Sequence, residues 1–246
     1  MANFTRGSVD IHYDDYGSGF PLLLIAPGGM RSAAAFWEQS PWNPITQLSD
    51  RYRVIAMDQR NAGRSTAPVS ADDGWATYTA DQLALMDHLG CEQFHLAGMC
   101  IGGPYIMGLI QAAPERVASA TLFQTIGLDE NRHAFYDIFD DWAQAIRDDH
   151  PEADEAAWDQ FRSNMYDGDN FLFNVDRDFV ATVQTPLLVL LGNDLYHPES
   201  SSRIVHDAAP NSTMIEDWMD GSARTAAMEQ FAAFLAEHTS AVSNSD

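Results

Sequence analysis

Apolar residues in this chain gather in short continuous runs, and these runs alternate with segments whose apolar residues have helical spacing. The apolar runs predict strands that are buried on both faces, and they occupy residues 21–26, 53–57, 94–98, 117–123 and 187–191, with a weaker one at 213–216. Helices are predicted at 79–89, 101–112 and 223–238. Strands that alternate with helices in this way predict an α/β fold, in which helices cover both faces of a mostly parallel, twisted sheet.

Two segments lie outside this alternation. Residues 9–16 alternate apolar and polar positions and end in a glycine-rich turn, which indicates an outer antiparallel strand. The stretch 125–184 is rich in aromatic residues and carboxylates, and it is too long for a simple crossover. We therefore expect a single domain over residues 1–246, with 125–184 inserted as a small helical lid. The alternative is that these helices only cover the core and gate nothing.

Composition narrows the range of partners. The chain has 246 residues, 36 acidic against 13 basic, with a net charge of -23, and every basic residue is arginine. Such a charge repels phosphate backbones and anionic membranes, so we expect a small-molecule substrate and neither nucleic acid nor an anionic membrane as partner. The chain has no long apolar span and no signal-peptide pattern at its start, which predicts a cytoplasmic protein. The oligomeric state stays open.

Two cysteines flank the predicted strand at 94–98. An extended segment of that length holds Cys91 and Cys100 too far apart for a disulfide, so both are predicted to be free thiols. Cys100 is the central residue of Gly98-Met99-Cys100-Ile101-Gly102, which has the form G-x-nucleophile-x-G. A strand precedes this motif and a helix follows it, as a nucleophile elbow requires. Cys100 is therefore predicted to be a nucleophile, and the N–H of Ile101 an oxyanion donor; the alternative is a buried, inert thiol.

Three motifs in order along the chain carry a family resemblance. They are Pro27-Gly28-Gly29-Met30, the stretch from Asp58 to Ser65 (Asp-Gln-Arg-Asn-Ala-Gly-Arg-Ser), and the elbow. With them the chain resembles the α/β-hydrolase superfamily over nearly its whole length, and the cysteine in the elbow is similar to that of dienelactone hydrolases. The resemblance implies an α/β-hydrolase fold and a second oxyanion donor at the Gly29 N–H. It also implies a structural turn after Asp58, in which Asn61 replaces a glycine.

The same resemblance implies a triad whose acid is Asp194, because an apolar strand leads into Gly192-Asn193-Asp194. The family's histidine would follow the last strand, but residues 217–222 contain none. A thiol depends less on a base than a serine does, yet the leaving group still needs a proton. His197, three residues after Asp194, is the best substitute, although a solvent-facing loop histidine or a helix cap would have the same sequence. His133 and His150 in the predicted lid are weaker candidates.

Cofactor and metal motifs are missing from the sequence. There is no HExxH, no CxxC and no G-x-G-x-x-G, so we expect neither cofactor nor metal. The favoured hypothesis is a hydrolase or acyl transferase that acts on a small ester, lactone or thioester through a Cys100 thioacyl intermediate. The alternatives are a small-molecule binding protein that has lost turnover, and a lyase or C–C bond-cleaving enzyme on the same scaffold.

Overall fold

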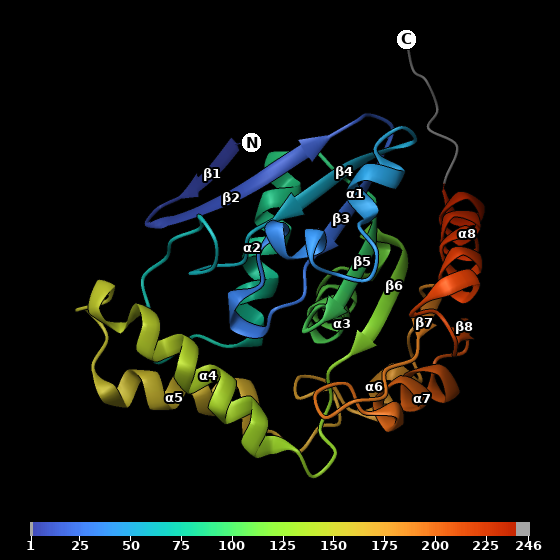
Figure 1. Ribbon diagram of the computed structural model, residues 1–246. Helices are drawn as coiled ribbons and strands as arrows, with labels where there is room; N and C mark the ends of the chain where they lie inside the picture. The colour runs from blue at the N-terminus through green and yellow to red at the C-terminus, as the bar shows by residue number, and fades with distance from the viewer. Residues whose placement is uncertain (1, 240–246) are drawn as a thin grey trace.

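An eight-stranded sheet forms the centre of the computed structural model, which describes residues 2–239 (Figure 1). Its strands are β1 (Ala2–Arg6), β2 (Val9–Tyr16), β3 (Phe20–Ile25), β4 (Tyr52–Met57), β5 (Phe94–Cys100), β6 (Val117–Thr125), β7 (Leu187–Leu190) and β8 (Ser212–Ile215). They lie in the order β1-β2-β4-β3-β5-β6-β7-β8. β1 pairs with β2 and β2 with β4 in antiparallel orientation, and every pair from β4 to β8 is parallel. The predicted α/β class with a mostly parallel sheet is confirmed.

The outer strand is not the one that the sequence predicted. Residues 9–16 do form a strand, β2, but β1 pairs along its outer side and takes the edge of the sheet. The register joins Ala2 to Tyr13 and Arg6 to Val9. β1 escaped prediction because its sequence, Ala-Asn-Phe-Thr-Arg, has a single large apolar residue and is mostly exposed. β1 is held in place by backbone pairing with β2, because it has no hydrophobic face of its own.

Helices cover both faces of the sheet. The α-helices are α1 (Pro44–Leu48), α2 (Trp75–His88), α3 (Gly102–Ala112), α4 (Arg132–Ile146), α5 (Glu155–Tyr166), α6 (Arg177–Val180), α7 (Glu199–Ala208) and α8 (Gly221–His238). Four short 3₁₀ helices are η1 (Gly29–Arg31), η2 (Ala34–Glu38), η3 (Pro114–Arg116) and η4 (Arg147–Asp149). Successive residues of β3 illustrate the two layers: Leu23 packs in the core cluster that includes α2 and α3, and Leu24 packs in the cluster that includes α1 and α8.

Most predicted elements are present with shifted ends. α2 begins at Trp75, four residues before the predicted start, because the Thr77 hydroxyl accepts the Gly74 N–H at 3.2 Å and satisfies a free donor of the first turn. α8 likewise begins at Gly221. The strand predicted at 94–98 continues to Cys100. These shifts affect only the ends of the elements. The apolar residues in the middle of each element give the sequence pattern, and the same residues pack in the core.

The segment between β6 and β7 contains α4, η4, α5 and α6. In Figure 1, α4 and α5 lie side by side at the lower left, beyond the ends of the central strands. Phe139 and Trp142 of α4 make edge contacts with Phe161 of α5, with ring centroids 5.2 and 5.8 Å apart. The segment is therefore helical, as expected, and its aromatic residues pack in the same core cluster as α2 and α3. Its motion as a lid stays a prediction.

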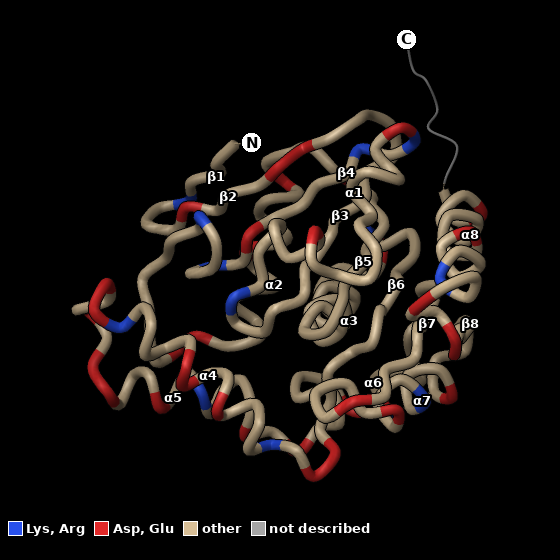
Figure 2. Tube along the Cα trace, in the orientation of Figure 1, with Lys and Arg blue, Asp and Glu red and all other residues tan. Residues whose placement is uncertain are grey.

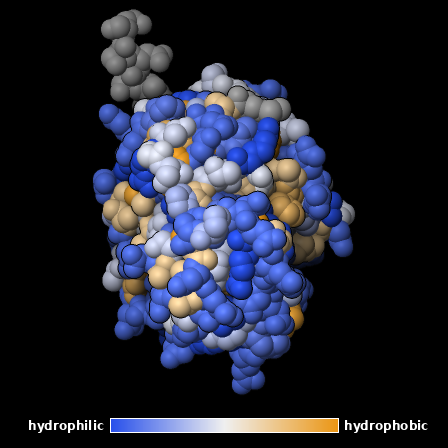
Figure 3. All heavy atoms as spheres, turned by 90° about the vertical axis from the view of Figure 1, so that its left-hand side faces the viewer, coloured by the Kyte–Doolittle hydropathy of each residue, from blue (hydrophilic) through white to orange (hydrophobic). Residues whose placement is uncertain are grey.

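Acidic residues recur along the whole trace, while arginines are few (Figure 2). The face at the left of Figure 1, turned toward the viewer in Figure 3, is largely hydrophilic with small separate apolar areas. No helix within residues 2–239 combines the length and the apolar character needed to span a membrane.

Candidate active site

The turn after β5 holds Cys100 in an uncommon backbone conformation. Its φ is 63°, in the left-handed region that residues with a Cβ rarely adopt. Small neighbours make the turn possible. A Cβ on Gly98 would lie 2.9 Å from the Gly102 Cα, and a Cβ on Gly103 would lie 1.9 Å from the Thr125 hydroxyl oxygen. The sequence therefore places Cys100 at the end of a buried strand with its side chain presented at the start of α3.

The Cys100 thiol is half-buried, and its surroundings favour the thiolate. Burial alone would raise the pKa of the thiol. Interaction with His197, together with the backbone N–H groups of Gly28 and Ile101, outweighs burial and lowers that pKa below its ordinary value. The other cysteine, Cys91, is also free, but burial raises the pKa of its thiol. Both thiols are free as predicted, and their pKa values are shifted in opposite directions.

Asp194 and His197 share the loop between β7 and α7. One oxygen of the Asp194 carboxylate is hydrogen-bonded to Nδ1 of His197 at 2.8 Å. The other oxygen accepts hydrogen bonds from the backbone N–H groups of Tyr196 at 2.9 Å and His197 at 3.0 Å. A Cβ on Gly192 would lie 2.6 Å from the His197 carbonyl oxygen, so the loop is tightly folded. Three hydrogen bonds to one carboxylate thus fix both the loop and the imidazole.

The second ring nitrogen of His197, Nε2, is buried and has no hydrogen-bond partner of ordinary geometry among the described residues. The ring and the Cys100 thiol line the same cavity, and they are close enough for each to shift the pKa of the other. Burial alone would lower the pKa of His197, but Cys100 and Asp194 raise it to about 9. Since the pKa of the thiol falls while that of the imidazole rises, the pair favours transfer of the thiol proton to His197. Asp194 stays ionised: burial opposes its charge, but His197 and the two backbone N–H groups lower its pKa.

A cavity of about 270 Å³ opens beside this pair. Its walls bring together the elbow, the turn before η1, the inserted helices and the loop after β7. The lining residues are Gly28, Gly29, Arg31, Cys100, Ile101, Ile126, Phe135, Ile138, Tyr166, Tyr196 and His197. Phe135 stacks on Tyr166 with ring centroids 5.5 Å apart, and its edge meets Tyr196 at 6.0 Å. The inserted segment therefore contributes an aromatic wall to the cavity that holds the thiol.

The predicted oxyanion donors both line this cavity. The Ile101 N–H reaches the Cys100 sulfur, and so does the N–H of Gly28, which the sequence did not single out. Gly29, the predicted donor, has a φ of 57°, and a Cβ there would lie 3.0 Å from Ile138 of α4. The turn thus places the Gly28 amide at the nucleophile, and Gly29, the next residue, lines the same cavity.

The turn after β4 is hydrogen-bonded to the start of η2. The buried Asp58 carboxylate accepts the backbone N–H groups of Ala34 at 2.8 Å and Arg64 at 2.9 Å. Asn61 adopts a φ of 56°, which confirms that it replaces a glycine in the left-handed conformation. Its side-chain oxygen accepts the Ala67 N–H at 2.7 Å. The turn is structural, as predicted.

The remaining candidate imidazoles lie elsewhere. His133 is exposed on α4, and His150 is bound to Glu152 at 2.9 Å. Neither lines the cavity. Across the part of the chain that the structure describes, no group of three or more histidine, cysteine, aspartate or glutamate side chains could hold a metal ion.

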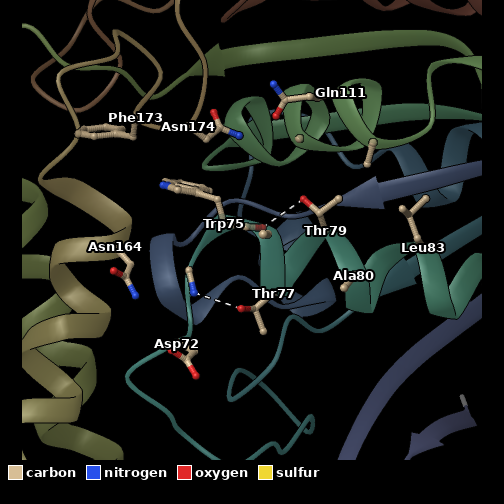
Figure 4. A pocket seen from close by; sticks show the side chains of 14 residues that line it. Asp72, Trp75, Thr77, Thr79, Ala80, Leu83, Gln111, Asn164, Phe173 and Asn174 are labelled. Carbon is tan, nitrogen blue, oxygen red and sulfur yellow. Dashed lines mark hydrogen bonds between the residues drawn. The ribbon is translucent and has the colours of Figure 1, made fainter.

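A larger cavity, of about 650 Å³, lies between α2, α3 and the inserted segment (Figure 4). Trp75, Phe173 and Asn174 line one end of it, and Thr79 and Leu83 of α2 lie toward the other. The hydroxyls of Thr77 and Thr79 are hydrogen-bonded to the backbone of their own helix. No cysteine or histidine lines this cavity, so the chemistry belongs to the smaller one.

Known proteins resemble this chain in sequence. A candidate carbamate hydrolase, RutD, from Azorhizobium caulinodans is 39% identical over 119 residues, which are 47% of this chain and 41% of that protein. A candidate non-heme chloroperoxidase from Synechocystis sp. is 30% identical over 167 residues, 63% of this chain and 56% of that protein. The matches thus span about half the length of these relatives.

Similarity in structure is more extensive. The meta-cleavage product hydrolase CumD from Pseudomonas fluorescens IP01 superposes with a TM-score of 0.69 and covers 97% of both chains, at 22% identity. At that identity the likeness concerns the fold alone. The family described as the alpha/beta hydrolase fold matches residues 21–237 of this chain. Because this match spans most of the sequence, the protein belongs to the alpha/beta hydrolase fold family.

Proposed function

We propose that this protein is a cofactor-free hydrolase or acyl transferase that acts on a small ester, lactone or thioester through a thioacyl intermediate on Cys100. The observation that carries the proposal is the hydrogen bond between Asp194 and His197 at 2.8 Å, together with the position of His197 and Cys100 in the wall of one small cavity. Its relatives bear the names of different activities, so the reaction is argued from this site and not from their names.

Acylation begins with the thiolate, whose proton resides on His197. The Cys100 sulfur attacks the carbonyl carbon, and the carbonyl oxygen becomes an oxyanion. When the tetrahedral intermediate collapses, the bond to the leaving group breaks. The imidazolium of His197 donates its proton to the departing alkoxide or thiolate. The products of this half are the thioacyl enzyme, a neutral imidazole and the protonated leaving group.

Backbone amides stabilise the developing oxyanion. The N–H groups of Ile101 and Gly28 interact with the sulfur, and Gly29 lines the same cavity, so that these amides need little rearrangement to reach an oxygen on the attacked carbon. Gly29 and Ile101 are the donors that we assign to the oxyanion. The Gly28 N–H, which already contacts the sulfur, stabilises the thiolate.

Deacylation uses the same imidazole as a base. Neutral His197 takes a proton from water while the water oxygen attacks the thioacyl carbon, and the C–S bond then breaks to return the thiolate beside a protonated imidazole. Asp194 remains an anion throughout and holds the Nδ1 side of the ring. If an alcohol or thiol replaces water, the same steps give acyl transfer.

Neither alternative hypothesis is favoured by an observation of its own. The lack of histidine at 217–222 suggested a non-catalytic binding protein, and the position of His197 in the same cavity as Cys100 supports the hydrolase hypothesis instead. C–C bond cleavage rests only on the principle that one fold supports many reactions. Analysis of the products by mass spectrometry separates C–C cleavage from acyl hydrolysis.

The test uses p-nitrophenyl acetate with the purified protein, with Cys100→Ala, and with Cys91→Ala as the matched control. We expect a burst of p-nitrophenol and an acetyl adduct on the peptide that contains Cys100. Cys91→Ala keeps both, and Cys100→Ala loses both. If Cys100→Ala turns over the ester as fast as the parent chain, and no adduct forms on the parent chain, the proposal is wrong.

A further inference from the structure

Arg31 is a positively charged residue in the wall of the catalytic cavity. It is the last residue of η1, the turn that begins at Gly29, and it is half-buried. No hydrogen bond or ion pair joins its side chain to another residue within 2–239. Arg31 therefore lines the cavity that holds the reactive thiol, and its guanidinium has no partner from the described part of the protein.

Arg31 differs from the other arginines that form no ion pair. Arg51, Arg147 and Arg177 are exposed, and the Arg224 guanidinium donates to the Met219 carbonyl oxygen. Acidic residues outnumber arginines by 36 to 13. Ion pairs are formed by Arg6, Arg53, Arg60, Arg64, Arg116, Arg132, Arg162 and Arg203. Because so many carboxylates are available within the protein, an arginine that lines a cavity without a partner indicates that its partner is a bound ligand.

The cavity itself supplies no counter-charge. No aspartate or glutamate lines it, and Asp194, the nearest carboxylate in the catalytic chain, is bound to His197. Ile126, Phe135 and Ile138 form apolar walls. Beside such walls a carboxylate of the substrate is attracted more strongly than in water, because fewer solvent dipoles compete for it. A guanidinium binds a carboxylate through two parallel N–H donors, which also fixes the orientation of the bound molecule.

Resting on the function proposed above, we propose that Arg31 determines specificity for substrates that carry a carboxylate in addition to the reacting acyl group. η1 connects this residue directly to the amides at the thiol, so the carboxylate and the scissile carbonyl are recognised by one short segment. A cavity of about 270 Å³ limits the substrate to a small molecule. The class is a small anionic ester, lactone or thioester, such as a hemiester of a short dicarboxylic acid.

The net charge of -23 does not oppose this assignment. Distant surface carboxylates repel an anionic substrate, but salt screens charges beyond about 8 Å under physiological conditions. A contact within hydrogen-bond distance is screened much less. The long-range charge slows encounter, and the local guanidinium governs binding after encounter.

The experiment compares two esters of matched length, the mono-p-nitrophenyl ester of glutaric acid and p-nitrophenyl pentanoate. Arg31→Gln removes the positive charge, and Arg31→Lys keeps the charge but loses the two parallel N–H donors. Arg51→Gln is the control, because Arg51 is an exposed arginine outside this cavity. For the hemiester we expect Arg31→Gln to lower kcat/KM by about 10- to 100-fold, mainly through KM. The neutral ester changes by less than about threefold, Arg31→Lys falls between the parent and Arg31→Gln, and Arg51→Gln has no effect. Equal losses on both esters would overturn the proposal.

A binding measurement separates this proposal from the proposed function. If neither ester is turned over, the hydrolase assignment fails, and glutarate is then tested by thermal shift against neutral glutaramide. We expect glutarate to raise the Tm of the parent chain and of Arg51→Gln but not that of Arg31→Gln. A shift that persists in Arg31→Gln, or the absence of any shift with glutarate, would contradict the role of Arg31.

Discussion

Two loops at the same end of the sheet differ in what they give to the active site. The loop after β7 carries Asp194 and His197, which are hydrogen-bonded to each other at 2.8 Å. The loop after β8 carries Trp218, which is fully buried, and its indole N–H donates to the Leu191 carbonyl oxygen at 2.9 Å. Trp218 also meets Phe123 edge-on at 5.7 Å. The β7 loop carries the side chains that we propose for catalysis, and the β8 loop carries a side chain that packs in the core.

In the proposed mechanism, the position of the acid and the base in the fold matters more than their order along the chain. The family resemblance put the histidine after the last strand, where this protein has a buried indole instead. Here the acid and the base are three residues apart on one loop, and hydrogen bonds within that loop orient the imidazole. A thiol suits this arrangement because its pKa is close enough to that of imidazole for the proton to move.

The largest expected effect comes from removing the imidazole of the β7 loop. His197→Ala is expected to lower kcat/KM by about 10²- to 10⁴-fold, because the leaving group and the attacking water both lose their proton partner. Steady-state kinetics with p-nitrophenyl esters measures this. His150→Ala, which removes an imidazole bound to Glu152, serves as the control and leaves the rate unchanged. A His197→Ala rate equal to that of the control would show that another group moves the proton.

Asp194→Asn is expected to have the next largest effect, a loss in kcat of about 10- to 100-fold. Asparagine can still accept backbone N–H groups, so the loop keeps its shape, but the charge that raises the pKa of His197 is lost. The matched variant in the other loop is Asp217→Asn, for which we expect full activity. If both variants lost the same share of kcat, the rate would depend on the total negative charge at this end of the sheet and not on the hydrogen bond between Asp194 and His197.

The pH dependence should follow the imidazole. Because the pKa of His197 is raised to about 9, its protonated form is available below that pH and is lost above it. We expect kcat/KM to fall by about tenfold for each pH unit above about 9, as the leaving group loses its acid. The residual activity of His197→Ala should instead rise with pH as its thiol ionises. A parent profile that keeps rising through this range would contradict the acid role.

The smallest expected effect on the rate lies in the β8 loop. Trp218→Phe removes the hydrogen bond to Leu191 and part of the packing against Phe123, and it should lower the free energy of unfolding by about 1–3 kcal/mol. Urea unfolding followed by circular dichroism measures this loss. The rate per folded molecule should be unchanged. A loss of kcat without a loss of stability would place Trp218 in the chemistry and erase the contrast between the loops.

The sequence predicted the features that depend on local patterns. Buried strands such as β3 and β5 have unbroken apolar runs, and the elbow has glycines wherever a Cβ would collide. β1 was missed because its stability comes from pairing with β2. His197 could be selected as a candidate because it lies close to Asp194 in the chain.

Other parts of the site depend on contacts between distant segments. Tyr166 lines the cavity from the inserted segment, and its hydroxyl meets the Met30 sulfur at 3.6 Å. Arg31 follows a glycine motif that drew attention to the backbone rather than to the side chain after it. The sequence pattern near these two residues does not mark them as part of a cavity. The spacing of apolar residues predicts a helix and its buried face, but it does not predict which distant segments lie beside the ends of that helix.

The central claim is that His197 of the β7 loop holds the proton of Cys100. The most direct measurement is the ultraviolet absorbance of the thiolate as a function of pH, taken as the difference between the parent chain and Cys100→Ala, and repeated in a His197→Ala background. The account predicts that in the parent chain the Cys100 thiolate is present well below the ordinary thiol pKa of about 8.5, and that without His197 it forms only at higher pH because burial then dominates. A thiolate that forms at the same pH with and without His197 would contradict the claim.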